Sequence, residues 1–214
     1  MHGKFRRILS TKRANNNALA YHIYKTEGWV IHSADVGEAD RFVDIFSSEF
    51  GLIRAMARGV RKLDSKLRYG LQDYSFGNIY LVKGREIWRV VNVEKLDYLD
   101  RVFRDREVLK MIGRIFSLLR RLIKGEEKDR AVFDDVKSAI KLISETSLSR
   151  NDLRQMEVIL VFRILQRLGY IGRDGRVDYL ADFSGWDLKI LKIDDLTRVA
   201  AVLQINRSIS HSHL

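Results

Sequence analysis

The sequence predicts an α+β protein in which a small five-stranded β-barrel is followed by an all-α helical domain. From Glu27 to about Leu96, short runs of alternating apolar and polar residues are separated by glycine-containing turns, which is typical of strands. From about Asp97 the apolar residues recur every three or four positions, which indicates amphipathic helices. The 214 residues suffice for two domains. We expect a basic arm at residues 1–24, the barrel at 25–97 and the helical domain at 98–214.

The first domain has the layout of an OB-fold. This barrel usually binds nucleic acid on the face of its second and third strands and on nearby loops. A hairpin turn is expected at Lys83–Arg85, and the longer connection after the third strand could hold a short helix. The five strands are expected at residues 28–33, 41–50, 52–59, 76–82 and 86–96.

The third expected strand shows its two faces clearly. Side chains alternate across a strand, so Ile53, Ala55 and Ala57 are expected to face the core. Arg54 and Arg58 then lie together on the opposite face.

The second domain is expected to contain four helices. Ser149 and Asp152 form a capping-box pattern before the third helix, which is apolar nearly all round and is expected at the centre of the bundle. Gly169 is a plausible end for it. The stretch 171–187 is expected to be a loop or a small hairpin that turns at Asp174–Gly175. The helices are expected at residues 99–125, 132–143, 153–170 and 193–210.

The charge of the chain favours a polyanionic partner. Lys and Arg number 39 against 28 Asp and Glu, a net charge of +11. The excess lies in residues 1–72, with 13 basic and 7 acidic residues, and in residues 101–130, with 10 and 5. Nucleic acid is the first candidate partner, an anionic membrane surface the second, and a bland basic surface the alternative to both.

Two absences from the sequence narrow the class of protein. There is no Cys, which excludes disulfides, thiolate zinc sites, iron–sulfur clusters and cysteine nucleophiles. No apolar run approaches the roughly 18 residues of a membrane span. We expect a cytoplasmic, nucleoid-associated protein without a metal or other cofactor.

The segment Gly59–Gln72, GVRKLDSKLRYGLQ, is called the basic segment below. Its cations and those of the preceding strand are opposed only by Asp64. Several close cations bind phosphates in a salt-dependent manner, and glycines permit a close approach of the backbone. The simpler interpretation is a solvated surface loop. The candidate DNA-binding residues are Arg54, Arg58, Arg61, Lys62, Lys66, Arg68 and Tyr69, with Lys83 and Arg85 of the hairpin turn.

Aromatic side chains near the basic segment could stack on bases, as single-strand binders require. Tyr69, Tyr74, Tyr80 and Trp88 are the candidates. Strand alternation could equally place Tyr80 and Trp88 in the barrel core.

A second group of cations lies on the first helix. Arg114, Arg120, Arg121 and Lys124 usually would form a solvated helix face. The alternative is a second nucleic-acid site or a site for an acidic peptide.

Catalytic groups are poorly represented. Asp35, Glu38 and Asp40 lie in one loop, where a turn and capping role is the simpler interpretation and a metal-dependent nuclease the alternative. His211 and His213 could share a metal but are more typical of a frayed tail. The stretch GRDGR lacks the lysine spacing of a phosphate-binding loop.

The stretch from Tyr24 to Glu86 resembles the amino-terminal domain of the RecO family of recombination mediators. The matching motifs are Gly37–Glu38–Ala39–Asp40, Gly51, Ile53–Arg54, Ala57–Arg58–Gly59, Arg61–Lys62, Ser65, Leu67, Gly70–Leu71–Gln72 and Ser75. The resemblance covers about residues 24–95, and RILQRLGY resembles the end of a central helix in the family's second domain.

The resemblance implies a non-enzymatic protein that binds single- and double-stranded DNA and anneals complementary strands. With RecR, members help to load RecA onto single-stranded DNA coated with single-strand-binding protein, whose acidic carboxy-terminal tail binds the helical domain. Many relatives carry a four-cysteine zinc module after the central helix, whereas Gly172–Ala181 holds no Cys here. The last helix is also short and lacks the usual basic ending. An OB-fold RNA-binding module, for example in ribosome assembly, is the alternative function.

Overall fold

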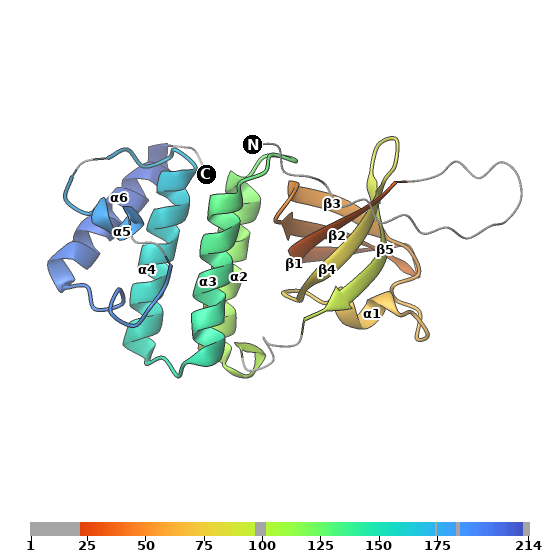
Figure 1. Ribbon diagram of the computed structural model, residues 1–214, viewed down its shortest axis with the longest axis horizontal. Coiled ribbons are helices and arrows are strands. Elements are labelled where there is room, and N and C mark those ends of the chain that lie inside the picture. Colours follow the sequence, from red (N-terminus) through yellow and green to blue (C-terminus); the bar gives the residue numbers. More distant parts are fainter. Residues whose placement is uncertain (1–21, 97–101, 174, 183–184, 212–214) are drawn as a thin grey trace, which may run out of the picture.

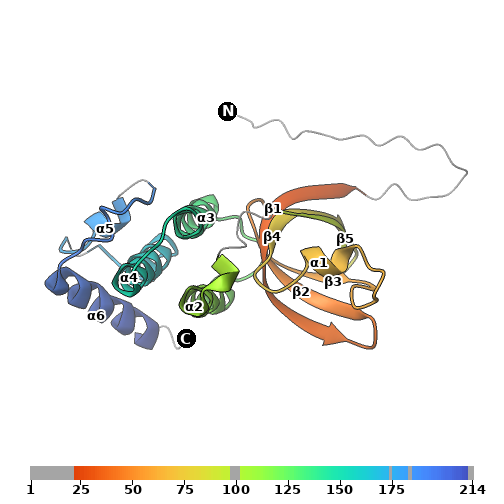
Figure 2. The ribbon, with the colours of Figure 1, turned by 90° about the horizontal axis from the view of Figure 1, so that it is seen from below.

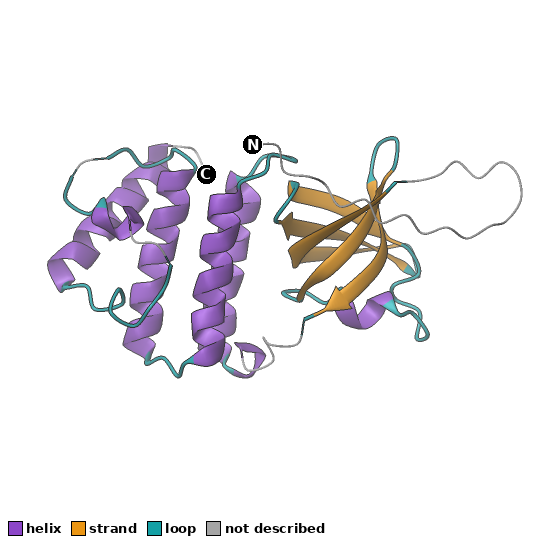
Figure 3. Ribbon diagram, in the orientation of Figure 1, coloured by secondary structure: helices purple, strands orange, loops and turns teal. Residues whose placement is uncertain are grey.

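The computed structural model describes residues 22–96, 102–173, 175–182 and 185–211. A β-barrel forms one end of the molecule and a set of helices the other, as Figure 1 and Figure 3 show. Most of the expected basic arm, Asp174 of the expected turn and His213 lie outside the described residues. Among the residues that are described, no helix has the length and apolar character needed to cross a bilayer.

The barrel contains the five predicted strands and closes in the order β1-β2-β3-β5-β4. Neighbouring strands are antiparallel except β3 and β5, which run parallel and pair at only two positions, Ala55 with Trp88 and Met56 with Arg89. A short helix lies in the connection between β3 and β4, as expected. The elements are β1 (Ile23–Val36), β2 (Asp40–Ser47), β3 (Gly51–Ala57), α1 (Leu67–Gly70), β4 (Phe76–Lys83) and β5 (Trp88–Lys95).

The barrel interior follows the predicted alternation. Ile53, Ala55 and Ala57 of β3 are completely buried, whereas Arg54 and Arg58 are exposed. Neighbouring strands contribute inward-facing apolar side chains in the same way. The prediction of an OB-type barrel followed by helices is therefore confirmed.

The helical domain differs from expectation at two places. Its first long helix begins at Arg106 rather than at residue 99, because the Asp105 carboxylate accepts hydrogen bonds from the backbone N–H groups of Glu107 and Val108 and so caps the helix. The stretch after the central helix contains a short helix where a loop or hairpin was expected. The elements are η2 (Val102–Arg104), α2 (Arg106–Leu122), α3 (Arg130–Glu145), α4 (Arg150–Arg167), α5 (Tyr179–Asp182) and α6 (Asp195–His211).

Helix α4 is the centre of the helical domain, as predicted. Ser149 and Asp152 form the expected capping box, and Gly169 follows the helix with a φ of 79°. Arg163 of α4 is completely buried, and its guanidinium donates to Asp135 of α3 and to the carbonyl of Leu180. The indole of Trp186 donates to the same carboxylate. This buried network holds the stretch around α5 against the bundle.

Besides the core inside the barrel, a second hydrophobic core is shared by the barrel and the helices. Helices α2 and α3 lie beside the barrel, with α4 behind them and α5 and α6 outermost (Figure 2). The ring of Phe133 in α3 lies 5.2 Å from that of Trp29 in β1 and 5.3 Å from that of Phe46 in β2. Phe76 of β4 and Phe116 of α2 belong to the same cluster. The two parts therefore form a single packed unit.

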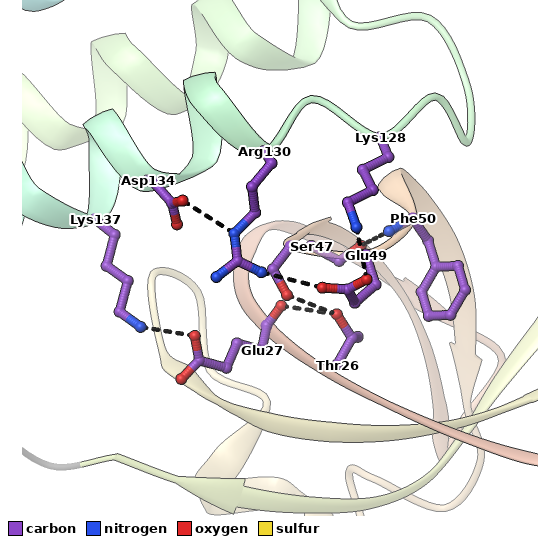
Figure 4. Close-up of polar contacts among 10 residues, drawn as sticks. Thr26, Glu27, Ser47, Glu49, Phe50, Lys128, Arg130, Asp134 and Lys137 are labelled. Atoms are coloured by element: carbon purple, nitrogen blue, oxygen red, sulfur yellow. Dashed lines mark hydrogen bonds and ion pairs between the residues drawn. The ribbon is translucent and has the colours of Figure 1, made fainter. Parts of the chain in front are cut away.

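On one side of this shared core, ion pairs join the barrel to α3 and to the α2–α3 connection (Figure 4). The Lys137 ammonium donates to Glu27 at 2.6 Å, and Lys128 and Arg130 both reach the carboxylate of Glu49, at 2.8 and 3.0 Å. The turn between β2 and β3 lies directly against the α2–α3 connection. A Cβ atom at Gly51, whose φ is 64°, would lie 2.2 Å from the carbonyl oxygen of Glu127, so this contact requires glycine.

The hairpin between β4 and β5 is tied to the same connection by Glu126. Its carboxylate accepts hydrogen bonds from the Lys83 ammonium at 2.8 Å and from the Trp88 indole at 2.7 Å. The hydrogen bond from Lys83 lowers the pKa of Glu126, and the hydrogen bond from Trp88 lowers it by a smaller amount.

Replacing Glu126 by Gln is expected to lower stability slightly at neutral pH. A carboxylate with a lowered pKa stabilises the fold above the unfolded-state value and loses this effect as the pH falls. Because the side chain is 44% exposed, we expect a loss below about 1 kcal/mol at pH 7. The difference between variant and parent should shrink below the ordinary Glu value of about pH 4.3. Urea unfolding at several pH values measures it; a difference that grows towards acid pH would contradict the assignment.

Candidate nucleic-acid interface

Both ends of the basic segment are fixed to the barrel. Val60 and Leu71 are buried in the barrel core, with exposed fractions of 2% and 0%. The backbone N–H of Gly59 donates to the Asp40 carboxylate at 2.7 Å, and the N–H of Arg61 donates to the carbonyl of Ala39 at 3.0 Å. The segment is therefore held against the β1–β2 turn rather than extended as a loose loop.

The other end of the basic segment packs closely on β5. A Cβ atom at Gly70 would lie 2.5 Å from the side chain of Val93, so glycine allows α1 to approach this strand. The Ser75 hydroxyl donates to the carbonyl of Gly70 at 2.7 Å. These contacts fix the residues between the two anchors relative to the barrel surface.

Most cations of the basic segment, and Arg58 directly before it, are exposed. Within the described part of the chain, no hydrogen bond or ion pair is recorded for the side chains of Arg58, Lys62, Lys66 and Arg68. Arg61 differs, because its guanidinium donates to the carbonyl of Gly37 at 2.8 Å and lies 3.4 Å from Asp35. Arg61 thus also fixes the β1–β2 turn.

The structure brings one cation from each of the two sequence-predicted basic groups, Arg54 and Arg120, together at Asp44. This β2 carboxylate lies 2.9 Å from the guanidinium of Arg120 in α2 and 3.9 Å from that of Arg54 in β3. The Arg54 guanidinium also lies 4.8 Å from the ring centre of Phe42. Arg54 of β3 and Arg120 of α2 are therefore neighbours at this carboxylate.

The other candidates of α2 are arranged differently. Arg114 is bound to Glu157 of α4, and its guanidinium donates to that carboxylate at 2.7 Å. Arg121 and Lys124 are exposed near the end of α2. Arg114 therefore forms an ion pair between helices, whereas Arg121 and Lys124 are exposed.

A groove of about 320 Å³ lies on the outer face where β3 and β5 diverge. Its floor is apolar, and arginines edge it. Sequence reasoning missed Arg89, because the parallel pairing of β5 with β3 joins strands that are far apart in the chain. Its strand position between buried Trp88 and Val90 is the signal that predicts an outward side chain. The lining residues are Met56, Arg58, Val82, Arg89, Val90 and Val91.

Lys83 and Arg85 lie away from the basic segment. Since β5 runs parallel to β3, the hairpin that precedes Trp88 is at the start of β3, whereas Arg58 follows its end. Lys83 is bound to Glu126. The structure therefore does not bring these two cations into one cluster with the others.

The aromatic candidates have different environments. Tyr69 is exposed, and the Lys95 ammonium lies 4.3 Å from its ring centre. Tyr80 faces outward and donates to Glu94, whereas Trp88 is only 4% exposed and belongs to the barrel core. Tyr74 packs against Phe116. Tyr69 is thus the candidate whose ring is most accessible to a base.

The three acids expected in one loop do not all lie there, because the strands extend further than predicted: Asp35 is in β1, Asp40 begins β2, and only Glu38 lies in the turn. The Asp35 carboxylate accepts from Arg41 at 2.8 Å, and Asp40 holds Gly59. Among the described residues, no group of three or more His, Cys, Asp or Glu is placed to hold a metal ion. The imidazole of His211 lies 2.7 Å from the carbonyl of Arg207.

Replacing Asp40 by Ala is expected to loosen the basic segment. The variant loses the acceptor for the Gly59 N–H, so we expect a loss of about 1–2 kcal/mol in the free energy of unfolding. DNA binding should weaken severalfold because the cations lose their fixed position. Glu38→Ala is the matched control, since it removes an exposed carboxylate of the same turn for which the described residues show no hydrogen bond or ion pair. Loss of a magnesium-dependent DNA cleavage on Asp40→Ala would instead support the nuclease interpretation.

Comparison with known proteins shows a similarity to one family of DNA repair proteins. Residues 22–99 match the family described as Recombination protein O N terminal. A DNA repair protein RecO of Clostridium novyi is 24% identical over 148 residues, which are 69% of this chain and 57% of the relative. The RecO of Roseiflexus is 29% identical over 148 residues, 69% of this chain and 50% of the relative. The RecO of Desulfitobacterium hafniense is 34% identical over 86 residues, 40% and 32% of the two chains.

The matched part thus spans about half the length of the first two relatives and about a third of the last. It includes the whole described barrel and the fixed basic segment. On these similarities, the barrel and the basic segment of this chain resemble the amino-terminal domain of the RecO family.

Proposed function

We propose that this chain acts in DNA repair and recombination by binding single- and double-stranded DNA along the side of the barrel that carries the basic segment. The observation that carries the proposal is the set of exposed cations on a segment fixed at both ends. Cations held in place lose little conformational freedom when they bind phosphates. The similarity to proteins named DNA repair protein RecO supports DNA as the polyanion.

The proposed activity is the annealing of complementary strands. Two strands repel each other through their phosphates, and cations at a shared surface lower that repulsion. Base pairing then drives the reaction, so the protein makes and breaks no bond and acts as a binding protein rather than as an enzyme. Arg58, Lys62, Lys66 and Arg68 are proposed to bind phosphates, and Tyr69 to stack on a base.

The proposed partners follow from the similarity to the RecO family. We expect the chain, together with RecR, to help load RecA onto single-stranded DNA coated with single-strand-binding protein. The acidic tail of single-strand-binding protein is proposed to bind the helical domain, where Arg121 and Lys124 are exposed cations. The site of action would be the nucleoid in the cytoplasm.

An annealing assay with two labelled complementary DNA strands tests the proposal. We expect the chain to accelerate annealing without nucleotide or metal ion, and the acceleration to decline steeply as salt is added. An RNA of the same sequence serves as competitor. Preferential binding to the RNA, with no acceleration of DNA annealing, would contradict the repair function and support an RNA-binding module.

A further inference from the structure

The middle of the basic segment presents an apolar side chain to solvent. Leu63 is 90% exposed, although nothing else in the barrel leaves a leucine so uncovered among the described residues. A single exposed leucine has no significance by itself. The position of Leu63 among cations is significant, because Arg61 and Lys62 precede it and Lys66 and Arg68 follow it.

The backbone holds Leu63 outward on a firm support. The N–H of Ser65 donates to the carbonyl of Lys62 at 3.2 Å, so Leu63 and Asp64 occupy the two corners of a hydrogen-bonded turn. A second turn precedes it, with the N–H of Lys62 donating to the carbonyl of Gly59. Polar residues and glycine usually occupy turn corners, so the fold gives no reason for leucine there.

From this placement we propose that Leu63 inserts between neighbouring bases of DNA bound at the basic segment. Apolar side chains such as Leu are the wedges with which proteins separate stacked base steps. The exposed cations on both sides would hold the phosphates that flank the opened step. The carboxylate of Asp64 repels phosphate at the turn itself. The turn is therefore expected to contact bases, and the cations on either side of it to contact phosphates.

Insertion of Leu63 gives the basic segment a preference among DNA ligands. Unstacking a base costs free energy in regular duplex, and it costs least where stacking is already weak, as at a mismatch. The wedge therefore favours DNA with a disrupted stack over perfect duplex. It rests on the proposed function, since insertion requires that DNA binds at this surface.

The test uses the full chain and a short duplex with 2-aminopurine beside a single-base mismatch. The fluorescence of 2-aminopurine rises when the base loses its stacking neighbour. At saturating protein the unchanged chain is expected to raise the signal. The variant Leu63→Gln should lose at least about two thirds of that rise while its dissociation constant changes less than about threefold, because the cations remain.

Two further variants control for the substitution itself. Leu63→Met keeps an apolar side chain of similar size and should keep the fluorescence rise. Leu196→Gln removes an equally unburied leucine, 85% exposed on α6 at the far end of the molecule, and should behave like the unchanged chain.

The outcomes separate this proposal from the proposed function. If Leu63→Gln binds and raises the signal as the unchanged chain does, the wedge is excluded while DNA binding stands. If the unchanged chain binds no DNA, both the proposed function and the insertion of Leu63 are excluded. Vesicles with anionic phospholipid form the last arm, because an apolar residue among cations also suits a membrane surface. Vesicle binding that depends on Leu63, without any fluorescence rise on DNA, would overturn the proposal.

Discussion

Replacing Arg58, Lys62 and Lys66 together by Ala is expected to weaken single-stranded DNA binding about a hundredfold at 0.1 M salt. Each phosphate contact releases condensed counterions and contributes about 0.7 to the slope of log affinity against log salt on single strands. Removing three contacts should therefore reduce the steepness of that slope by about 2. Arg61 stays in place, since it also holds the carbonyl of Gly37.

A matched control separates this effect from net charge. Replacing Arg150, Arg154 and Lys192 by Ala removes the same charge from exposed positions of the helical domain. The control should bind with nearly the parent's affinity and slope. Fluorescence anisotropy of a labelled strand across a salt series measures both. If the control lost as much affinity as the triple variant, the basic segment would have no special role.

The variant Phe133→Ala is expected to lower the free energy of unfolding by about 3–5 kcal/mol. Phe133 is completely buried and lies between the helical domain and the aromatic rings of the barrel. Its loss leaves a cavity in the core that both parts share. Because neither part can fill the cavity alone, both should be destabilised together.

Thermal unfolding followed by two probes tests this shared core. Far-ultraviolet circular dichroism reports mainly the helices, and tryptophan fluorescence reports Trp29 and Trp88 of the barrel as well as Trp186. The two transitions should coincide in the parent and shift together in the variant. Phe42→Ala, on the outer wall of the barrel, should cost much less. Separate transitions of barrel and helices in the parent would contradict a single packed unit.

Local patterns predicted most of the fold. Strand alternation placed Ile53, Ala55 and Ala57 in the core, and the capping box at Ser149 placed the start of α4. Contacts between distant segments were not accessible in this way. The parallel pairing of β3 with β5 joins strands separated by the basic segment and β4. The beginning of α2 was misplaced because apolar periodicity continued through residues 99–105, whereas the Asp105 cap fixes the helix start.

The candidate site was predictable in composition but not in arrangement. Charge density identified the basic segment, because phosphate binding depends on the number of nearby cations. Partners across the fold could not be read from the chain: Arg114 is bound to Glu157, and Arg120 shares Asp44 with Arg54. The environment of Trp88 could not be predicted, because alternation separates the two faces of a strand without showing which one is buried. In the closed barrel Trp88 lies in the core.

Chemical footprinting of lysines tests the central claim most directly. Brief acetylation of the full chain, with and without saturating single-stranded DNA, is read out for each lysine by mass spectrometry. Lys62 and Lys66 should react much more slowly in the complex, because phosphates cover their ammonium groups. Lys141 and Lys192, exposed in the helical domain, serve as references that should not change, and Lys124 reports on a second site at the end of α2. Unchanged reaction of Lys62 and Lys66 in a complex that still holds DNA would contradict the basic segment as the DNA-binding surface.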